Sequence, residues 1–185
     1  MASAFTHAVA AAAIGTVFAR RGWPLRFWVL GAVCAIAPDA DVVGLPLGIA
    51  FGSVFGHRGL THSLLFAAAL AVVVARCSGR IPESVSRPRL WLYLFLAEAS
   101  HGVLDALTNG GPGIAFFAPF DNTRYFFPVR PVVVSPLGIR PFFSEWGLRV
   151  IESELLWIWL PSLIFAGLVV ILRRRINRGP SGDSA

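Results

Sequence analysis

The sequence predicts an all-α membrane protein: a polytopic bundle of about five short helices with a long irregular segment on its outer side. Apolar residues make up 56% of the 185-residue chain and charged residues only 14%, about half the share usual in soluble proteins. The mean hydropathy of +0.68 indicates that the outer surface is apolar as well. Six Trp and fifteen Phe in this length of chain point the same way. This composition excludes a disordered chain and an ordinary cytosolic protein.

Five apolar runs, each bounded by Pro, Gly or Arg, are the expected helices: residues 2–19, 25–37, 60–75, 90–107 and 155–172. We expect the first to be a retained helix rather than a signal peptide, because its basic residues follow the apolar stretch. The second would span only about 20 Å of a hydrocarbon core about 30 Å thick, so we expect irregular backbone after Pro38. Residues 108–154, which include six prolines, are expected to form an extended cap.

These runs predict a single membrane-embedded domain over residues 1–178. The small polar residues 179–185 are expected to form a disordered tail. The two cysteines, Cys34 and Cys77, are too few for a disulfide framework and lack the CxxC spacing of zinc or redox motifs.

The basic residues predict how the chain is oriented. All sixteen are Arg, and they lie between or after the apolar runs, so we interpret them as topology signals and expect no nucleic-acid partner. Eleven share one side: Arg20, Arg21, Arg26, Arg76, Arg80, Arg87, Arg89, Arg173, Arg174, Arg175 and Arg178. Five lie on the other: Arg58, Arg124, Arg130, Arg140 and Arg149. The positive-inside rule therefore predicts a multi-pass protein of the cell membrane with its N-terminus outside and its C-terminus in the cytoplasm.

Seven His and Asp residues gather at the helix ends that this count assigns to the outer face. They are His7, Asp39, Asp41, His57, His62, His101 and Asp105. Ionisable groups at membrane depth are costly and need partners or a function. His101 and Asp105 share one helical face at i and i+4, and an extended step would point Asp39 and Asp41 to one side, where a cation would relieve their repulsion. We interpret all seven as candidate metal ligands.

Imidazole and carboxylate ligands without a thiolate favour zinc, with manganese or iron as alternatives. Seven candidates exceed the three or four ligands of one catalytic zinc, which favours a two-metal site and hydrolysis, with a phosphoester as the expected substrate. We expect Asp39 and His62 to take part in catalysis, with Arg58 beside them. Arg58, and Arg124 or Arg130, could pair with phosphate oxygens. The alternative for these arginines is a solvated or headgroup-facing charge.

The segments around these residues resemble the YdjM-like family of bacterial and archaeal membrane-bound, predicted metal-dependent hydrolases. The matching segments are TH at 6–7, PDAD at 38–41, HRGLTHS at 57–63, HGVLD at 101–105, LTNGG at 107–111 and APF at 118–120. The resemblance covers most of the chain through about residue 136, and it implies a hydrolase whose ligands are the His and Asp of these motifs. An all-helical site with HxxxD is also remotely similar to the zinc-dependent phospholipase C and P1 nuclease group, which cleave phosphodiesters.

The expected substrate is a lipid or lipid-linked molecule that reaches a recessed site from the outer leaflet. One alternative is a metal or proton transporter that uses the same His/Asp cluster as a translocation site. A transporter needs polar groups through the full depth of the membrane, and residues 64–75 and 164–172 contain none. Another is a structural protein in which the His/Asp pairs hold the helices together. The sequence leaves the oligomeric state open.

Overall fold

A computed structural model describes residues 1–19, 22–79 and 85–177 of the chain. Its elements are the helices α1 (Ala4–Phe18), α2 (Leu25–Ile36), α3 (Leu64–Cys77), α4 (Arg87–Ala106), α5 (Ile139–Phe142), α6 (Glu145–Glu154) and α7 (Leu160–Ile176), the 3-10 helices η1 (Ala37–Gly44) and η2 (Leu60–His62), and the π-helical turn η3 (Leu155–Trp159). Apart from two isolated β-bridges, the described residues are helical or irregular. The prediction of an all-α fold is confirmed.

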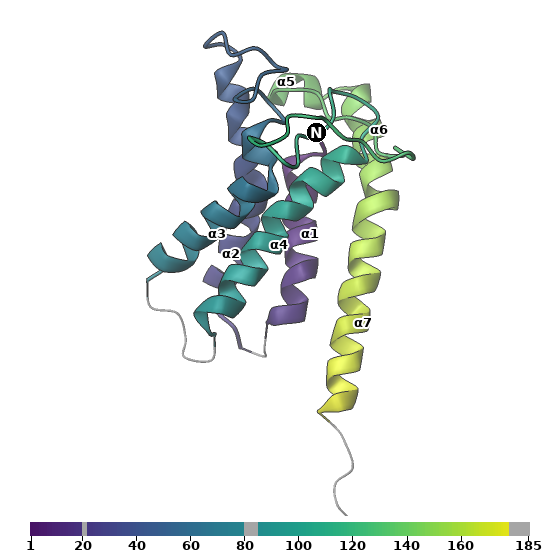
Figure 1. The fold of residues 1–185 in the computed structure, drawn as a ribbon. Helices are drawn as coiled ribbons and strands as arrows, with labels where there is room; N and C mark the ends of the chain where they lie inside the picture. The colour runs from purple at the N-terminus through teal and green to yellow at the C-terminus, as the bar shows by residue number, and fades with distance from the viewer. Residues whose placement is uncertain (20–21, 80–84, 178–185) are drawn as a thin grey trace, which may run out of the picture.

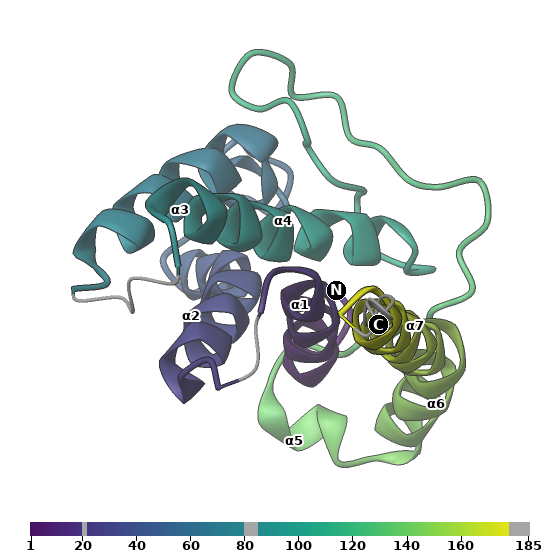
Figure 2. The same ribbon diagram turned by 90° about the horizontal axis from the view of Figure 1, so that it is seen from below.

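Helices α1 to α4 form the main bundle (Figure 1). In this bundle α1 contacts α2, α4 and α7, and α4 also packs against α2 and α3. Seen from below, α1 lies between α2 and α7, and α4 runs across one side of them (Figure 2). The N-terminus lies at the same end of the bundle as α5 and α6. The start of α1 and the end of α4 therefore meet at that end.

All five predicted helices are present, with shifted ends. The third begins at Leu64 rather than at residue 60, because residues 60–62 form the separate turn η2. Ser63 then caps α3, where its hydroxyl oxygen accepts a hydrogen bond from the Phe66 amide at 3.1 Å. The fourth begins at Arg87, with Pro88 in its first turn, where no amide hydrogen is needed.

Irregular backbone begins later than the prediction places it: residues 39–44 belong to η1, and turns and irregular backbone follow at residues 45–59. The chain continues from α2 directly into η1, and Pro38 stands at the start of η1, where its missing amide hydrogen breaks no hydrogen bond. Together the two helices form a run of 20 residues, Leu25–Gly44, that is long and apolar enough to cross a membrane. The expectation that this run is too short to cross a membrane therefore does not hold.

The predicted cap over residues 108–154 is also shorter than expected. Irregular backbone occupies residues 107–138, and α5 and α6 follow it. Helix α6 continues through η3 into α7 without a break, which gives a helix of 32 residues, Glu145–Ile176, whose most apolar 18-residue stretch is almost entirely exposed. This is the second run with the length and composition of a membrane span. The total number of passes and the orientation stay predictions.

Some earlier expectations fall on residues that the structure does not describe. The disordered tail at 179–185 lies outside the described residues, as do Arg20, Arg21, Arg80 and Arg178 of the orientation count. The single-domain prediction for residues 1–178 stays a prediction.

The core of the bundle away from the N-terminal end is apolar and closely packed. Tyr93 on α4 is fully buried, and its ring stacks on Phe27 of α2 with centroids 4.2 Å apart. A Cβ at Gly31 would lie 1.8 Å from the Tyr93 hydroxyl oxygen, so only glycine allows α2 to approach this ring. The Tyr93 hydroxyl donates to the Ala11 carbonyl of α1 at 3.3 Å. This packing fixes the three helices that carry the polar residues at the other end.

A buried carboxylate attaches the long helix to α1. Glu154 is only 2% exposed, and it accepts hydrogen bonds from the Ser3 amide, from the Ser3 hydroxyl at 2.6 Å and from the Thr6 hydroxyl at 2.8 Å. The Trp159 indole donates to the Thr6 oxygen at 2.7 Å. The sequence interpretation missed Glu154, whose only signal is an acidic residue at the start of an apolar run.

We expect Glu154→Ala to lower the free energy of unfolding by about 2 kcal/mol, because three buried donors lose their acceptor. Thermal unfolding of the purified protein in detergent, followed by circular dichroism, measures this loss. Glu152→Ala is the matched control, since Glu152 lies on the same helix and is exposed. Equal unfolding temperatures for the two variants would show that Glu154 does not hold the long helix in place.

Candidate metal centre

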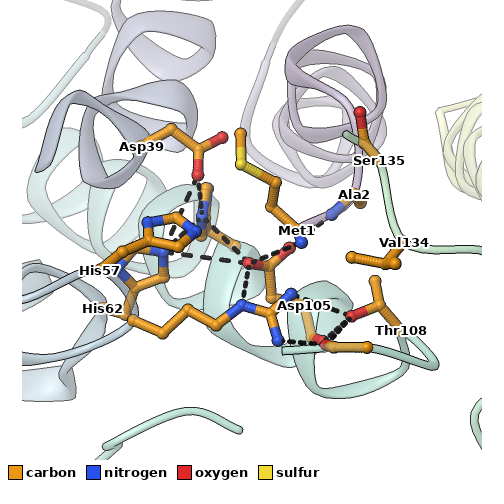
Figure 3. A network of polar contacts seen from close by, with 12 residues as sticks. Met1, Ala2, Asp39, His57, His62, Asp105, Thr108, Val134 and Ser135 are labelled. Atoms are coloured by element: carbon orange, nitrogen blue, oxygen red, sulfur yellow. Dashed lines mark hydrogen bonds and ion pairs between the residues drawn. The ribbon is translucent and has the colours of Figure 1, made fainter. Parts of the chain in front are cut away.

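The structure brings the predicted ligands together at the N-terminal end of the bundle (Figure 3). Two groups have ligand atoms within 4.8 Å of one another, and His62 belongs to both. The first group is Asp39, His62, His101 and Asp105, and the second is Asp41, His57 and His62. The aspartates at 39 and 41 come from η1, His62 from η2, and the pair His101 and Asp105 from the last turns of α4. All four residues of the first group are buried.

The spacing within the first group matches a tetrahedral metal site. The Nε2 atoms of His62 and His101 are 3.1 Å apart, and Asp39 Oδ1 lies 3.3 Å from the second of them and 3.8 Å from the first. Asp105 Oδ2 lies 3.9 Å from both nitrogens. Ligand atoms about 2.0 to 2.1 Å from a tetrahedral zinc are separated by about 3.3 Å. A small contraction around an ion would produce that geometry.

The Nδ1 atoms of His62 and His101, which point away from the cluster, have hydrogen-bond partners. His101 Nδ1 is 2.7 Å from the Ala35 carbonyl oxygen, which can only accept, so this nitrogen carries the hydrogen. The Thr61 hydroxyl donates to Asp41 at 2.5 Å and therefore accepts from His62 Nδ1 at 3.1 Å. In the neutral rings these partners place the hydrogen on Nδ1 and leave a lone pair on each Nε2. Two such lone pairs at 3.1 Å repel unless a metal ion lies between them or a proton on one nitrogen joins the two as a hydrogen bond.

Two carboxylates at the same point have oxygens that lack a hydrogen bond. Both oxygens of Asp39 and Oδ2 of Asp105 are buried without a hydrogen bond, an arrangement that is costly unless a cation or proton compensates it. Two imidazole nitrogens with two carboxylate oxygens are a donor set typical of zinc, manganese or iron. The residues of the first group therefore could hold a divalent metal ion.

The second group differs because its carboxylate is fully paired. Asp41 Oδ1 lies 2.6 Å from His57 Nδ1, and Oδ2 accepts from Thr61. The expectation that Asp39 and Asp41 point to one side is wrong, because η1 has three residues per turn and positions two apart diverge by about 120°. The Asp39 side chain therefore faces the first group, whereas the Asp41 carboxylate faces the Nδ1 atoms of His57 and His62.

His7 lies beside the first group rather than in it. Its ring stacks on His101 with centroids 3.7 Å apart, and its Nε2 is 3.5 Å from Asp105 Oδ1. Neither of its ring nitrogens has a hydrogen-bond partner among the described residues, although the ring is fully buried. Helix α1 thus places the His7 ring next to the Asp105 carboxylate. All seven predicted ligands lie in or next to this one cluster.

Arg58 is buried and paired with a candidate ligand. Its Nε lies 3.4 Å from Asp105 Oδ2, and its terminal nitrogens donate to the Gly110 carbonyl at 2.7 Å and the Thr108 hydroxyl at 3.0 Å. Its backbone has the positive φ of 65°, which is uncommon for a residue other than glycine. Gly111 packs against it so closely that a Cβ would lie 2.4 Å from Arg58 Nη1. The alternative of a solvated or headgroup-facing Arg58 is therefore wrong.

The other two arginines considered for phosphate pairing have structural contacts. Arg124 donates to the Arg58 carbonyl and to the Ser53 carbonyl, both at 3.1 Å, and so fastens the loop that precedes η2. Its partial burial lowers the pKa of its guanidinium. Arg130 is exposed and lies 4.6 Å above the ring of Phe126. Of the three, Arg58 is the one that contacts a ligand of the first group.

Two further groups lie beside the ligands. The Ala2 amide donates to Asp105 Oδ1 at 2.6 Å, so the start of α1 positions this carboxylate. Glu98 lies one turn before His101 on α4 and is buried with both oxygens unpaired, yet it falls outside the two ligand groups. A backbone donor leaves no trace in a sequence. The spacing of Glu98, three residues before His101, predicts that it lies on the same helical stripe as the ligands, and the structure buries it there.

Comparisons with known proteins agree with the predicted family. The family model described as YdjM inner membrane protein matches residues 1–176. The inner membrane protein YbcI of Escherichia coli (strain K12) is 36% identical over 174 residues, which cover 94% of this chain and all of that protein. The uncharacterized protein YvsG of Bacillus subtilis (strain 168) is 34% identical over 100 residues, which cover 50% of this chain and 58% of that protein.

No solved structure matches the chain. The remote similarity to the zinc-dependent phospholipase C and P1 nuclease group stays a prediction. The family model, by contrast, covers nearly the whole chain and includes every candidate ligand. The chain therefore belongs to the YdjM inner membrane protein family.

Proposed function

We propose that this protein is a membrane-bound, metal-dependent hydrolase that cleaves a phosphoester of a lipid or lipid-linked substrate. The observation that carries the proposal is the convergence of four buried ligand groups: His62 Nε2 and His101 Nε2 lie 3.1 Å apart beside the carboxylates of Asp39 and Asp105, three of whose oxygens lack a hydrogen bond. A divalent cation would interact favourably with both nitrogens and both carboxylates at once. Zinc is the preferred ion for this donor set, with manganese or iron as alternatives.

In this proposal Asp39, His62, His101 and Asp105 hold one ion. A divalent ion there would polarise a phosphoryl oxygen and activate water for attack. Asp39 has two oxygens without partners, so one can bind the ion while the other accepts a proton from water. Arg58 holds Asp105 in place from the other side. A single ion replaces the two-metal arrangement considered from the sequence, because Asp41 already has a partner on each oxygen.

Exposed aromatic residues near the same end of the bundle favour an amphiphilic substrate. Phe120 is 86% exposed and Phe143 is 82% exposed, and Trp146 at the start of α6 is also exposed. Aromatic side chains of this kind are typical of the interface between membrane and water. A substrate with acyl chains and a phosphoester headgroup would contact this surface and the buried ligands together.

The test is turnover of phosphoesters by the purified protein in mixed micelles. We expect hydrolysis of a lipid phosphoester that a chelator abolishes and added zinc or manganese restores. His62→Ala and His101→Ala should lower the rate by at least about 100-fold, since each removes a ligand, whereas Asp121→Asn at an exposed position should not.

Other results would assign a different function. Faster turnover of a soluble phosphodiester than of any lipid would contradict a lipid substrate. Metal uptake into protein-containing liposomes without any turnover would identify a transporter instead.

Orientation gives a separate prediction. We expect a cysteine introduced at Asn122, next to the metal centre's end of the bundle, to react with an impermeant reagent added outside the cell, because the Arg count places that end outside. The native Cys77 is exposed at the end of α3 and serves as the inward-facing comparison. Labelling should be read in a Cys34→Ala background. Reaction at Cys77 alone would place the metal centre on the cytoplasmic side.

A further inference from the structure

A groove with a volume of about 1260 Å³ lies at the far end of α1 from the metal centre. His7 and Phe18, at opposite ends of this helix, are eleven residues or about 17 Å apart, so the groove is separate from the ligand groups. Figure 2 looks at this end of the bundle and shows α7 beside α1. The walls come from α1, α2, α4 and α7, and include Phe18, Trp28, Arg89, Val170, Arg173 and Arg174.

The groove carries positive charge without matching carboxylates. Arg173 donates to the Val17 and Ala19 carbonyls and thereby holds the end of α7 against the end of α1. In the described part of the chain, the guanidinium groups of Arg89 and Arg174 have no hydrogen bond and no ion pair, and none of the residues that line the groove is acidic. An anion is the ligand that this charge would bind.

We propose that this groove binds an anionic phospholipid of the bilayer, whose phosphate pairs with Arg89 and Arg174. The apolar walls at Phe18, Trp28 and Val170 suit the first carbons of the acyl chains. The volume exceeds the 300 to 1,000 Å³ typical of sites for drug-sized ligands, so a phosphate ion alone would not fill it. Helix α7 presents an almost entirely exposed apolar surface, so a lipid can enter sideways from the bilayer.

Charge selects among lipids. A zwitterionic lipid also carries a positively charged headgroup amine, and the two arginines would repel that charge. Basic pockets between membrane helices are known to bind anionic headgroups in this way, with about 1 kcal/mol for each Arg near the membrane surface. Removing both arginines should therefore weaken binding by about 30-fold.

The experiment titrates the full-length protein in detergent micelles with phosphatidylglycerol, phosphatidylcholine and inorganic phosphate, and follows lipid-bound species by native mass spectrometry. We expect one phosphatidylglycerol to bind, phosphatidylcholine to bind at least about 10-fold more weakly, and phosphate not to compete at millimolar concentration. The double variant Arg89→Gln/Arg174→Gln should bind phosphatidylglycerol about 30-fold more weakly. Arg175→Gln, on the last turn of α7 and outside the groove lining, should bind it normally.

Val170→Trp fills the groove while it keeps every charge, so it tests the site even where the double variant is unstable. Loss of lipid binding in this variant supports the groove. Unchanged phosphatidylglycerol binding in Val170→Trp, equal affinity for the two lipids, or an equal loss in Arg175→Gln would each overturn the proposal. Displacement of the lipid by inorganic phosphate would show a simple anion site instead.

Discussion

Asp105→Asn is expected to lower metal affinity by more than about 100-fold while it leaves the helical content unchanged. The amide keeps the shape of the side chain, and its oxygen can still accept from the Ala2 amide. The substitution removes the negative charge that lies 3.9 Å from the Nε2 atoms of His62 and His101. Changes beyond the direct ligands already cost about 10- to 100-fold in metal affinity, so loss of a charged ligand costs more. Metal titration in micelles and circular dichroism measure the two quantities.

Two further variants separate loss of a ligand from loss of structure. Asp39→Asn removes a carboxylate that has no hydrogen-bond partner, so it should weaken metal binding as strongly while the metal-free protein unfolds at an equal or higher temperature. Asp121→Asn is the surface control, since the Asp121 carboxylate is exposed and bonds to its sequence neighbours Thr123 and Tyr125 rather than to the ligand groups. Full metal binding by Asp105→Asn and Asp39→Asn would show that the first group holds no ion.

The helices could be predicted because each is a long apolar run with clear ends. The errors fall where polar residues and prolines interrupt the pattern. Pro38 predicts a break only when the chain needs its amide hydrogen, and at the start of η1 it does not. Similarly, Glu145 to Glu154 carries enough charge to resemble an irregular cap, yet its helix continues into α7. The composition of residues 145–154 does not indicate that they form one continuous helix with α7.

The candidate ligands could be predicted because charged residues at membrane depth need a reason to be there. Their roles could not, since they depend on local backbone direction. Asp39 and Asp41 are two residues apart, and only the 3-10 geometry of η1 separates the unpaired carboxylate from the paired one. For Arg58, its partners Thr108 and Gly110 are about fifty residues away. No spacing rule connects segments that meet only through the folded bundle.

The second large effect is expected for Asp41→Asn, which tests whether the second group is a metal site or a support for the first. Asp41 contacts His57 directly and reaches His62 through Thr61. A carboxylate that orients a ligating ring raises metal affinity by about 10- to 100-fold. We therefore expect Asp41→Asn to weaken binding by that factor while the protein still takes up one ion per chain. His57→Gln should have a smaller effect, because the His57 ring is outside the first group.

Metal content distinguishes the two interpretations of Asp41. If the second group holds an ion of its own, the unchanged protein contains two ions per chain, and Asp41→Asn lowers that number to one without changing the affinity of the other. If Asp41 instead orients His62, the unchanged protein contains one ion, and the variant needs a higher free concentration of the same metal to fill it. Elemental analysis after dialysis against buffered metal, at concentrations above and below the dissociation constant, gives both numbers. We expect one ion, because both oxygens of Asp41 already have hydrogen-bond partners, whereas Asp39 and Asp105 retain oxygens without a hydrogen bond that face the two Nε2 atoms.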